Sequence, residues 1–128
     1  LDSISKKETL FPKKSYWNIM SMTSIANGLM ESVLERRMES IRPDNEKSKN
    51  FINKQEIRII RTIKWLENNW NNYNENYFTM DQIAIACALD YTIFRFNDKW
   101  KADSPKLNKW FNEFVKKDFM KFTTPYDK

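Results

Sequence analysis

Apolar residues recur at spacings of three and four in several long stretches of the chain, which is the periodicity of an amphipathic helix. The first stretch runs from about Ser15 to Ile41. Arg42-Pro43 ends it, because proline disfavours helical backbone in the residue before it. Gly28 lies inside this helix and costs about 1 kcal/mol relative to alanine, so we expect another backbone to approach it closely.

Two more helices follow from the same periodicity. One runs from about Ser48 to Trp70, and it is followed by a polar loop, residues 68–76, that holds six asparagines. After a loop that carries Trp100, Ser104-Pro105 opens the last long helix, with serine as the N-cap and proline at the first helical position. The apolar stripe of that helix contains Leu107, Trp110, Phe111, Phe114 and Val115. A short turn ends at Thr124-Pro125.

The clearest local start signal lies at residues 78–83. Thr79 at the N-cap and Gln82 three residues later predict a capping box, in which each side chain bonds to the other residue's backbone amide. Phe78 and Ile83 occupy the two positions of a hydrophobic staple. We therefore assign Thr79 and Gln82 a structural role at the start of a helix.

The helix that follows is apolar on every side from Ile83 to Leu89, which is typical of a helix buried among others. Cys87 lies in the middle of this run, and we expect it to be a buried, unreactive thiol. These seven residues are the longest apolar run in the chain, against the roughly 20 that a membrane helix needs. We expect no membrane association.

The elements together predict an all-α fold, a bundle of four to five helices around the buried central helix. With only one glycine and four prolines, the chain has little of the turn chemistry that a β-sandwich or barrel needs. Residues 1–14 read as an irregular linker and residues 15–128 as one helical domain. We do not expect Leu1 to be a natural start, so the chain is interpreted as a fragment.

The residue types exclude several kinds of chemistry. The chain has no histidine and one cysteine, so it cannot assemble a Ser-His-Asp or Cys-His nucleophile or a structural zinc site of the Cys/His type. We therefore expect no catalytic residue and no metal. One cysteine also fits a reducing compartment, which favours the cytoplasm.

The net charge of +5 admits a nucleic-acid interpretation. The basic residues are spread along the whole chain, however, and most lie beside acidic ones, whereas a nucleic-acid site gathers them on one face. We interpret the excess charge as a solvated surface and expect no nucleic-acid partner.

Several short motifs, in order along nearly the whole chain, resemble the C-terminal all-helical domain of bacterial glutathione S-transferases. The stretch Ala26-Asn27-Gly28-Leu29-Met30-Glu31 is similar to the Ala-Asp-Gly-Ile-Met-Asp of that family, with asparagine in place of the first aspartate. The other matching pieces are Leu10-Phe11-Pro12, Glu39-x-x-Arg42-Pro43, the capped helix from Thr79 to Leu89, Tyr91-x-x-Phe94-Arg95, Trp100, Pro105-x-Leu107-x-x-Trp110 and Thr123-Thr124-Pro125. The family usually has aspartate where Gln82 stands, and Lys117-Asp118-Phe119 replaces a more typical Arg-Pro-Ser.

The resemblance implies a division of labour between two domains. In glutathione transferases a thioredoxin-like N-terminal domain, absent from this chain, binds glutathione and activates its thiol. The helical domain supplies the wall of the pocket for a hydrophobic electrophile and much of a homodimer interface. The parent would be a detoxifying enzyme that conjugates the glutathione thiolate to the electrophile, and this fragment alone would be inactive.

The resemblance also suggests candidate site residues. Tyr16, Trp17 and Met20, near the start of the first long helix, and Arg37 further along it are candidates for substrate binding. Glu31, three residues after the glycine of the matching motif, is a candidate for the glutathione amine of the partner subunit. Each of these also reads as an ordinary core, dimer or solvated residue. The alternative function is a non-catalytic helical module for protein docking or dimerisation.

Overall fold

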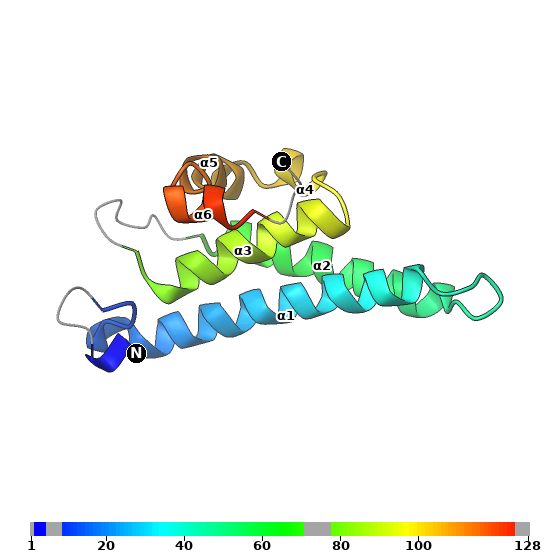
Figure 1. Cartoon of the computed structure of the whole chain (residues 1–128), viewed down its shortest axis with the longest axis horizontal. Helices are drawn as coiled ribbons and strands as arrows, with labels where there is room; N and C mark the ends of the chain where they lie inside the picture. Colours follow the sequence, from blue (N-terminus) through cyan, green and yellow to red (C-terminus); the bar gives the residue numbers. More distant parts are fainter. Residues whose placement is uncertain (1, 5–8, 71–77, 125–128) are drawn as a thin grey trace.

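The computed structural model describes residues 2–4, 9–70 and 78–124, and this part of the chain is helical with no strand (Figure 1). Two short 3-10 helices come first, at Asp2–Ile4 and Lys13–Ser15. The α-helices are α1 (Tyr16–Ser40), α2 (Lys49–Asn68), α3 (Met80–Arg95), α4 (Trp100–Asp103), α5 (Pro105–Phe114) and α6 (Asp118–Phe122). The all-α prediction is confirmed. Leu1, most of the asparagine-rich loop and Pro125 lie outside the described residues.

The long helix α1 packs along both α2 and α3, while α5 and α6 lie on the far side of α3 from α1 (Figure 1). The buried face of α1 meets apolar residues of α2 and α3 in one core. That core contains Met22, Ala26, Leu29, Val33, Ile59, Ile63, Leu66, Ala84, Ile85, Ala88, Leu89, Trp100, Leu107 and Phe111. Most of the apolar positions at helical spacing therefore form the interior. Trp110 and Val115 of the α5 stripe are only partly buried, however, and Leu34 and Met38 in the second half of α1 are exposed.

Helix α3 is central, but one prediction about it is wrong. Ala84, Ile85, Ala88 and Leu89 are buried in the main core, as expected, whereas Cys87 is exposed. The helix is covered by α1 on one side and α5 on another, and Cys87 lies on a face that neither covers. Apolar residue types on every side of a helix thus did not mean burial on every side.

Two further expectations are corrected. An added Cβ at Gly28 would meet no atom within 4 Å apart from its own helix, so no other backbone approaches this glycine. Its carbonyl oxygen accepts a hydrogen bond from the Ser32 hydroxyl at 2.8 Å within the same helix. Trp100, placed in a loop by the sequence, instead begins the short helix α4 and is buried.

A row of aromatic rings joins the end of α2 to the start of α3 through α5 and α6. Trp70 and Trp110 lie with their ring centroids 4.7 Å apart, and Trp110 lies 4.8 Å from Phe114. Phe114 in turn contacts Phe78 and Phe119 edge to face, at 6.2 and 5.8 Å. Such pairs contribute about 0.5–1.5 kcal/mol each beyond the area that they bury. The row fixes α5 and α6 against the rest of the bundle.

Candidate functional site

The substrate-binding candidates at the start of α1 form an exposed aromatic surface. The rings of Phe11 and Tyr16 lie 5.9 Å apart, and the ring of Trp17 meets that of Tyr16 edge to face at 5.2 Å. The Trp17 side chain is 80% exposed, and Tyr16 and Met20 are each 39% exposed. Tyrosine and tryptophan offer an apolar body with a polar tip, and methionine adapts to irregular shapes. This surface, Phe11, Tyr16, Trp17 and Met20, is called the aromatic end of α1 below.

Hydrogen bonds hold the segment that leads into this surface. The Leu10 carbonyl oxygen accepts from the Met80 backbone amide at 3.1 Å, which ties the segment to the start of α3. The Asp2 carboxylate accepts from the Thr9 hydroxyl and, at 2.7 Å, from the Leu10 backbone amide. The Thr9 hydroxyl and then that amide hold the pKa of Asp2 below its usual value. Leu10 therefore ties the lead-in to the start of α3, and Asp2 bonds back to Thr9 and Leu10 within the lead-in.

The start of α3 differs in its bonds from the predicted capping box. Thr79 is the N-cap residue with an extended backbone, as expected, but its hydroxyl makes no bond to the first backbone amides of the helix. It donates to the Asp81 carboxylate instead, and it accepts from the Gln82 side-chain amide at 3.4 Å. Three buried polar side chains thus satisfy one another. Phe78 and Ile83 both pack on the small cluster of Ala86, Phe114 and Met120.

The remaining candidates on α1 lie away from its aromatic end. Glu31 is exposed about midway along the helix, and Arg37 is exposed near its last turn. Arg37 follows Met20 by 17 residues, a separation of roughly 25 Å at 1.5 Å per residue. The structure therefore brings Tyr16, Trp17 and Met20 together on one surface and places Arg37 apart from them.

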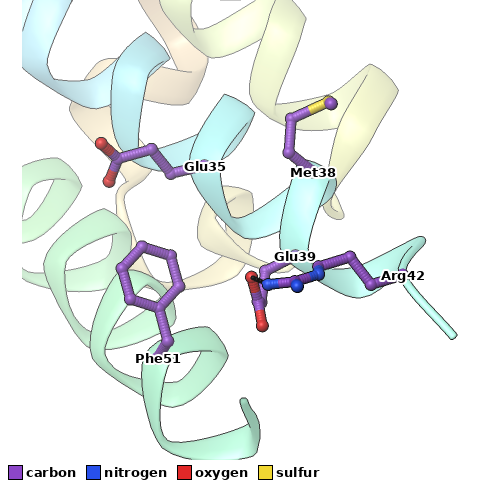
Figure 2. Close-up of a pocket in the computed structure, with 5 residues that line it drawn as sticks. All are labelled: Glu35, Met38, Glu39, Arg42 and Phe51. Carbon is purple, nitrogen blue, oxygen red and sulfur yellow. Dashed lines mark hydrogen bonds and ion pairs between the residues drawn. The ribbon is translucent and has the colours of Figure 1, made fainter. Parts of the chain in front are cut away.

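A second feature, which the sequence did not indicate as a site, is an open groove of about 350 Å³ between the end of α1 and the start of α2. It is lined by Glu35, Met38, Glu39, Arg42 and Phe51. Figure 2 shows the Phe51 ring on α2 below Glu35 of α1, with Glu39 and Arg42 close together beside it. Met38 and Phe51 are partly exposed and give the groove an apolar surface.

Ion pairs neutralise the charges of this groove. The Arg42 guanidinium donates to the Glu39 carboxylate at 3.2 Å, and Arg58 lies 3.8 Å from Glu35. Glu39 also accepts from the Ser48 backbone amide at 2.7 Å. That amide, followed by Arg42, lowers the pKa of Glu39. Because the carboxylates are paired, the groove offers apolar contacts more than net charge.

No group of three or more metal-ligating side chains occurs among the described residues. No described helix is long and apolar enough to cross a membrane.

The Cys87 thiol on α3 is exposed, yet the surrounding groups desolvate it in part and, with the Asp90 carboxylate, raise its pKa. A raised pKa keeps the thiol protonated near neutral pH and therefore weakly nucleophilic.

The fold can be compared with solved structures. A glutathione transferase family member from Pseudomonas fluorescens Pf-5, with bound S-(propanoic acid)-glutathione, superposes on 98% of this chain with a TM-score of 0.90 and 26% sequence identity. The same bacterium's protein with bound glutathione gives a TM-score of 0.91. The chain has the fold of the C-terminal helical domain of a glutathione transferase.

Further comparisons define how far the similarity extends. The glutathione S-transferase of Methylobacillus flagellatus KT, solved with glutathione, shares the fold at a TM-score of 0.89, with 21% identity and 98% of this chain covered. This glutathione transferase-like chain spans 67% and 63% of the two Pseudomonas chains and 65% of the Methylobacillus chain. No family model matches its sequence, and no curated protein matches it.

Proposed function

We propose that the chain is the substrate-binding and dimerisation domain of a glutathione transferase, which joins the glutathione thiolate to a hydrophobic electrophile. The observation that carries this proposal is the similarity of 98% of the chain to bacterial proteins of this family whose structures contain glutathione. In this proposal a thioredoxin-like domain that precedes Leu1 binds glutathione and activates its thiol. The enzyme works as a homodimer in the cytoplasm.

The aromatic end of α1 is the proposed wall of the electrophile pocket. Its three rings contact one another in sequence, and Tyr16, Trp17 and Met20 leave much of their surface uncovered, as a wall that faces another domain would. Trp17 and Met20 supply apolar surface, and the Tyr16 hydroxyl supplies a hydrogen-bonding group. Glu31 is the proposed contact for the glutathione amine of the other subunit, because an exposed carboxylate attracts an ammonium group. Arg37 would then act only on the far part of a large substrate.

The test is calorimetric titration of glutathione into the chain joined to the residues that precede Leu1 in its gene, with residues 1–128 alone as the control. Heat of binding from the longer chain alone is the expected result. It would place glutathione in the preceding domain and leave the helical domain as pocket wall. If neither protein gives heat of binding, the result would contradict the assignment as a glutathione transferase and favour the non-catalytic docking module.

A second measurement addresses the pocket. In the joined chain, Trp17→Ala and Met20→Ala should raise KM for an electrophile such as chlorodinitrobenzene by about tenfold, since each removes apolar contact with the substrate. Ile57→Ala removes an apolar side chain on α2 whose exposed fraction, 53%, lies between those of Met20 and Trp17, and it serves as the matched control. Equal KM values for all three variants would contradict the assignment of the aromatic end of α1.

A further inference from the structure

Helix α2 separates its charges between its two sides. Its two carboxylates both point inward: Glu56 accepts a hydrogen bond from Arg36 of α1 at 2.7 Å, and Glu67 is buried against α5. Its five cations, by contrast, are all exposed, and they are Lys49, Lys54, Arg58, Arg61 and Lys64. The side of α2 that faces away from the bundle therefore carries positive charge without a carboxylate of its own.

The same side also carries a line of exposed residues at the spacing that a second helix needs for packing. Asn50, Asn53, Ile57, Ile60 and Lys64 follow one another at spacings of three, four, three and four residues, and all five are exposed. This is the spacing with which one helix packs lengthwise on another. Ile57 is 53% exposed and Ile60 60% exposed, and they form the apolar centre of the line. The buried side of α2 already uses a different set, Gln55, Ile59, Ile63 and Leu66, to contact the bundle.

The cations that border this line are available to a partner. Lys54, Arg61 and Lys64 make no ion pair with any residue in 2–4, 9–70 or 78–124. Arg58 is already engaged, because it donates to the Gln55 side chain at 3.1 Å and lies 3.8 Å from Glu35. An apolar centre with a charged rim is the usual composition of a protein-binding surface. The set Asn50, Asn53, Lys54, Ile57, Ile60, Arg61 and Lys64 is called the outer face of α2 below.

We propose that the outer face of α2 docks an amphipathic helix of another protein, one whose apolar stripe is bordered by carboxylates. The apolar stripe would cover Ile57 and Ile60, and the carboxylates would pair with Lys54 and Arg61 on the rim. A second copy of this chain fits poorly, because two such faces would bring cations against cations in either orientation. This inference is independent of the proposed glutathione chemistry.

Two other anionic partners fit the geometry less well. In a helix that lies on a bilayer, the apolar residues form one sector and the cations flank it, whereas here Lys64 occupies the same line as Ile57 and Ile60. Nucleic acid would pair with the cations but would leave the two isoleucines at the centre without an apolar contact. A carboxylate-bordered helix satisfies both the charges and the isoleucines.

The experiment measures fluorescence anisotropy of a labelled synthetic helix of about three heptads, with leucine at the a and d positions and glutamate at e and g. The probe should bind the chain, and its affinity should fall as salt is raised. The charge reversal K54E/R61E should weaken binding at least about tenfold, and I57S/I60S similarly. The matched control K99E/K109E removes two exposed cations from elsewhere on the surface and should leave the affinity unchanged.

Circular dichroism and thermal melting of each variant show whether it is folded, so that a loss of affinity is assigned only to a folded protein. The proposal is overturned if the glutamate helix does not bind, if a helix with lysine at e and g binds equally well, or if K99E/K109E loses as much affinity as K54E/R61E. It is also overturned if phosphatidylglycerol vesicles or duplex DNA bind the chain through Lys54 and Arg61 while the glutamate helix does not.

Discussion

The carboxylate of Glu67, in the last turn of α2, accepts a hydrogen bond from the backbone amide of Leu107 in the first turn of α5, at 2.9 Å. It also accepts from the amide of Lys106 at 3.2 Å. The first amides of a helix lack partners within the helix, and a negative charge there is favourable. Ser104, the N-cap residue itself, makes no such bond. Helix α5 is therefore capped by a residue 40 positions away in the sequence.

Glu67→Ala should lower the free energy of unfolding by about 2–3 kcal/mol, because one buried and one partly buried backbone amide lose a charged acceptor. Urea denaturation measures this change. Glu113→Ala is the matched control, since that glutamate pairs with Lys116 on the surface and should cost less than about 0.5 kcal/mol. A loss as small for Glu67 as for Glu113 would show that the capping bonds contribute little.

Gly28→Ala should raise the free energy of unfolding by about 1 kcal/mol. The new methyl group meets no atom within 4 Å apart from its own helix, and alanine has the higher helix propensity. The measurement is again urea denaturation of the chain. A destabilised variant would mean that something approaches this glycine after all, for example a second subunit.

The contribution of Glu39 should depend on pH. Its pKa is lower in the folded chain than its ordinary value of 4.5, so the unfolded state binds more protons in that range. Its stabilising effect is complete above 4.5 and is lost as the pH falls through the lowered pKa. The stability difference between the chain and its Glu39→Gln variant should shrink on acidification to pH 3. A difference that stays constant would rule out the bonds to Ser48 and Arg42 as its source.

The Cys87 thiol should react slowly although it is accessible. Partial desolvation and Asp90 raise its pKa, so at pH 7 less of it is thiolate than in free cysteine. We expect iodoacetamide to modify the folded chain more slowly than it modifies glutathione, and the rate to rise with pH into the alkaline range. Asp90→Asn should speed the reaction at neutral pH, and an unchanged rate would exclude the charge as a cause.

Periodicity was enough to predict the long helices. The stripe of Ile19, Met22, Ala26, Leu29 and Val33 is buried as a set, because residues three and four apart lie on one face of a helix and are removed from water together. Glu39 and Arg42, which pair where α1 ends, are likewise only three residues apart in the sequence. Contacts between residues a few positions apart can thus be predicted from the sequence.

The sequence did not indicate which other helices cover each face of a given helix. Cys87 and Ala86 are both small and apolar, yet only Ala86 is covered by α5 and α6. The cap of α5 comes from Glu67, while Ser104 carried the local signal. In the candidate site, the aromatic residues near the start of α1 fell on one surface, but nothing in the sequence indicated the groove at Phe51. Contacts between distant segments depend on the packing of whole helices.

The two indole rings of Trp70 and Trp110, 4.7 Å apart, join the end of α2 to α5. Indoles this close couple their electronic transitions and give a paired positive and negative band in the circular dichroism spectrum, separate from the signal of the helical backbone. The chain therefore contains an intrinsic optical reporter for one event, the docking of α5 onto α2, and this signal can be followed in an unlabelled protein while the other helices remain intact.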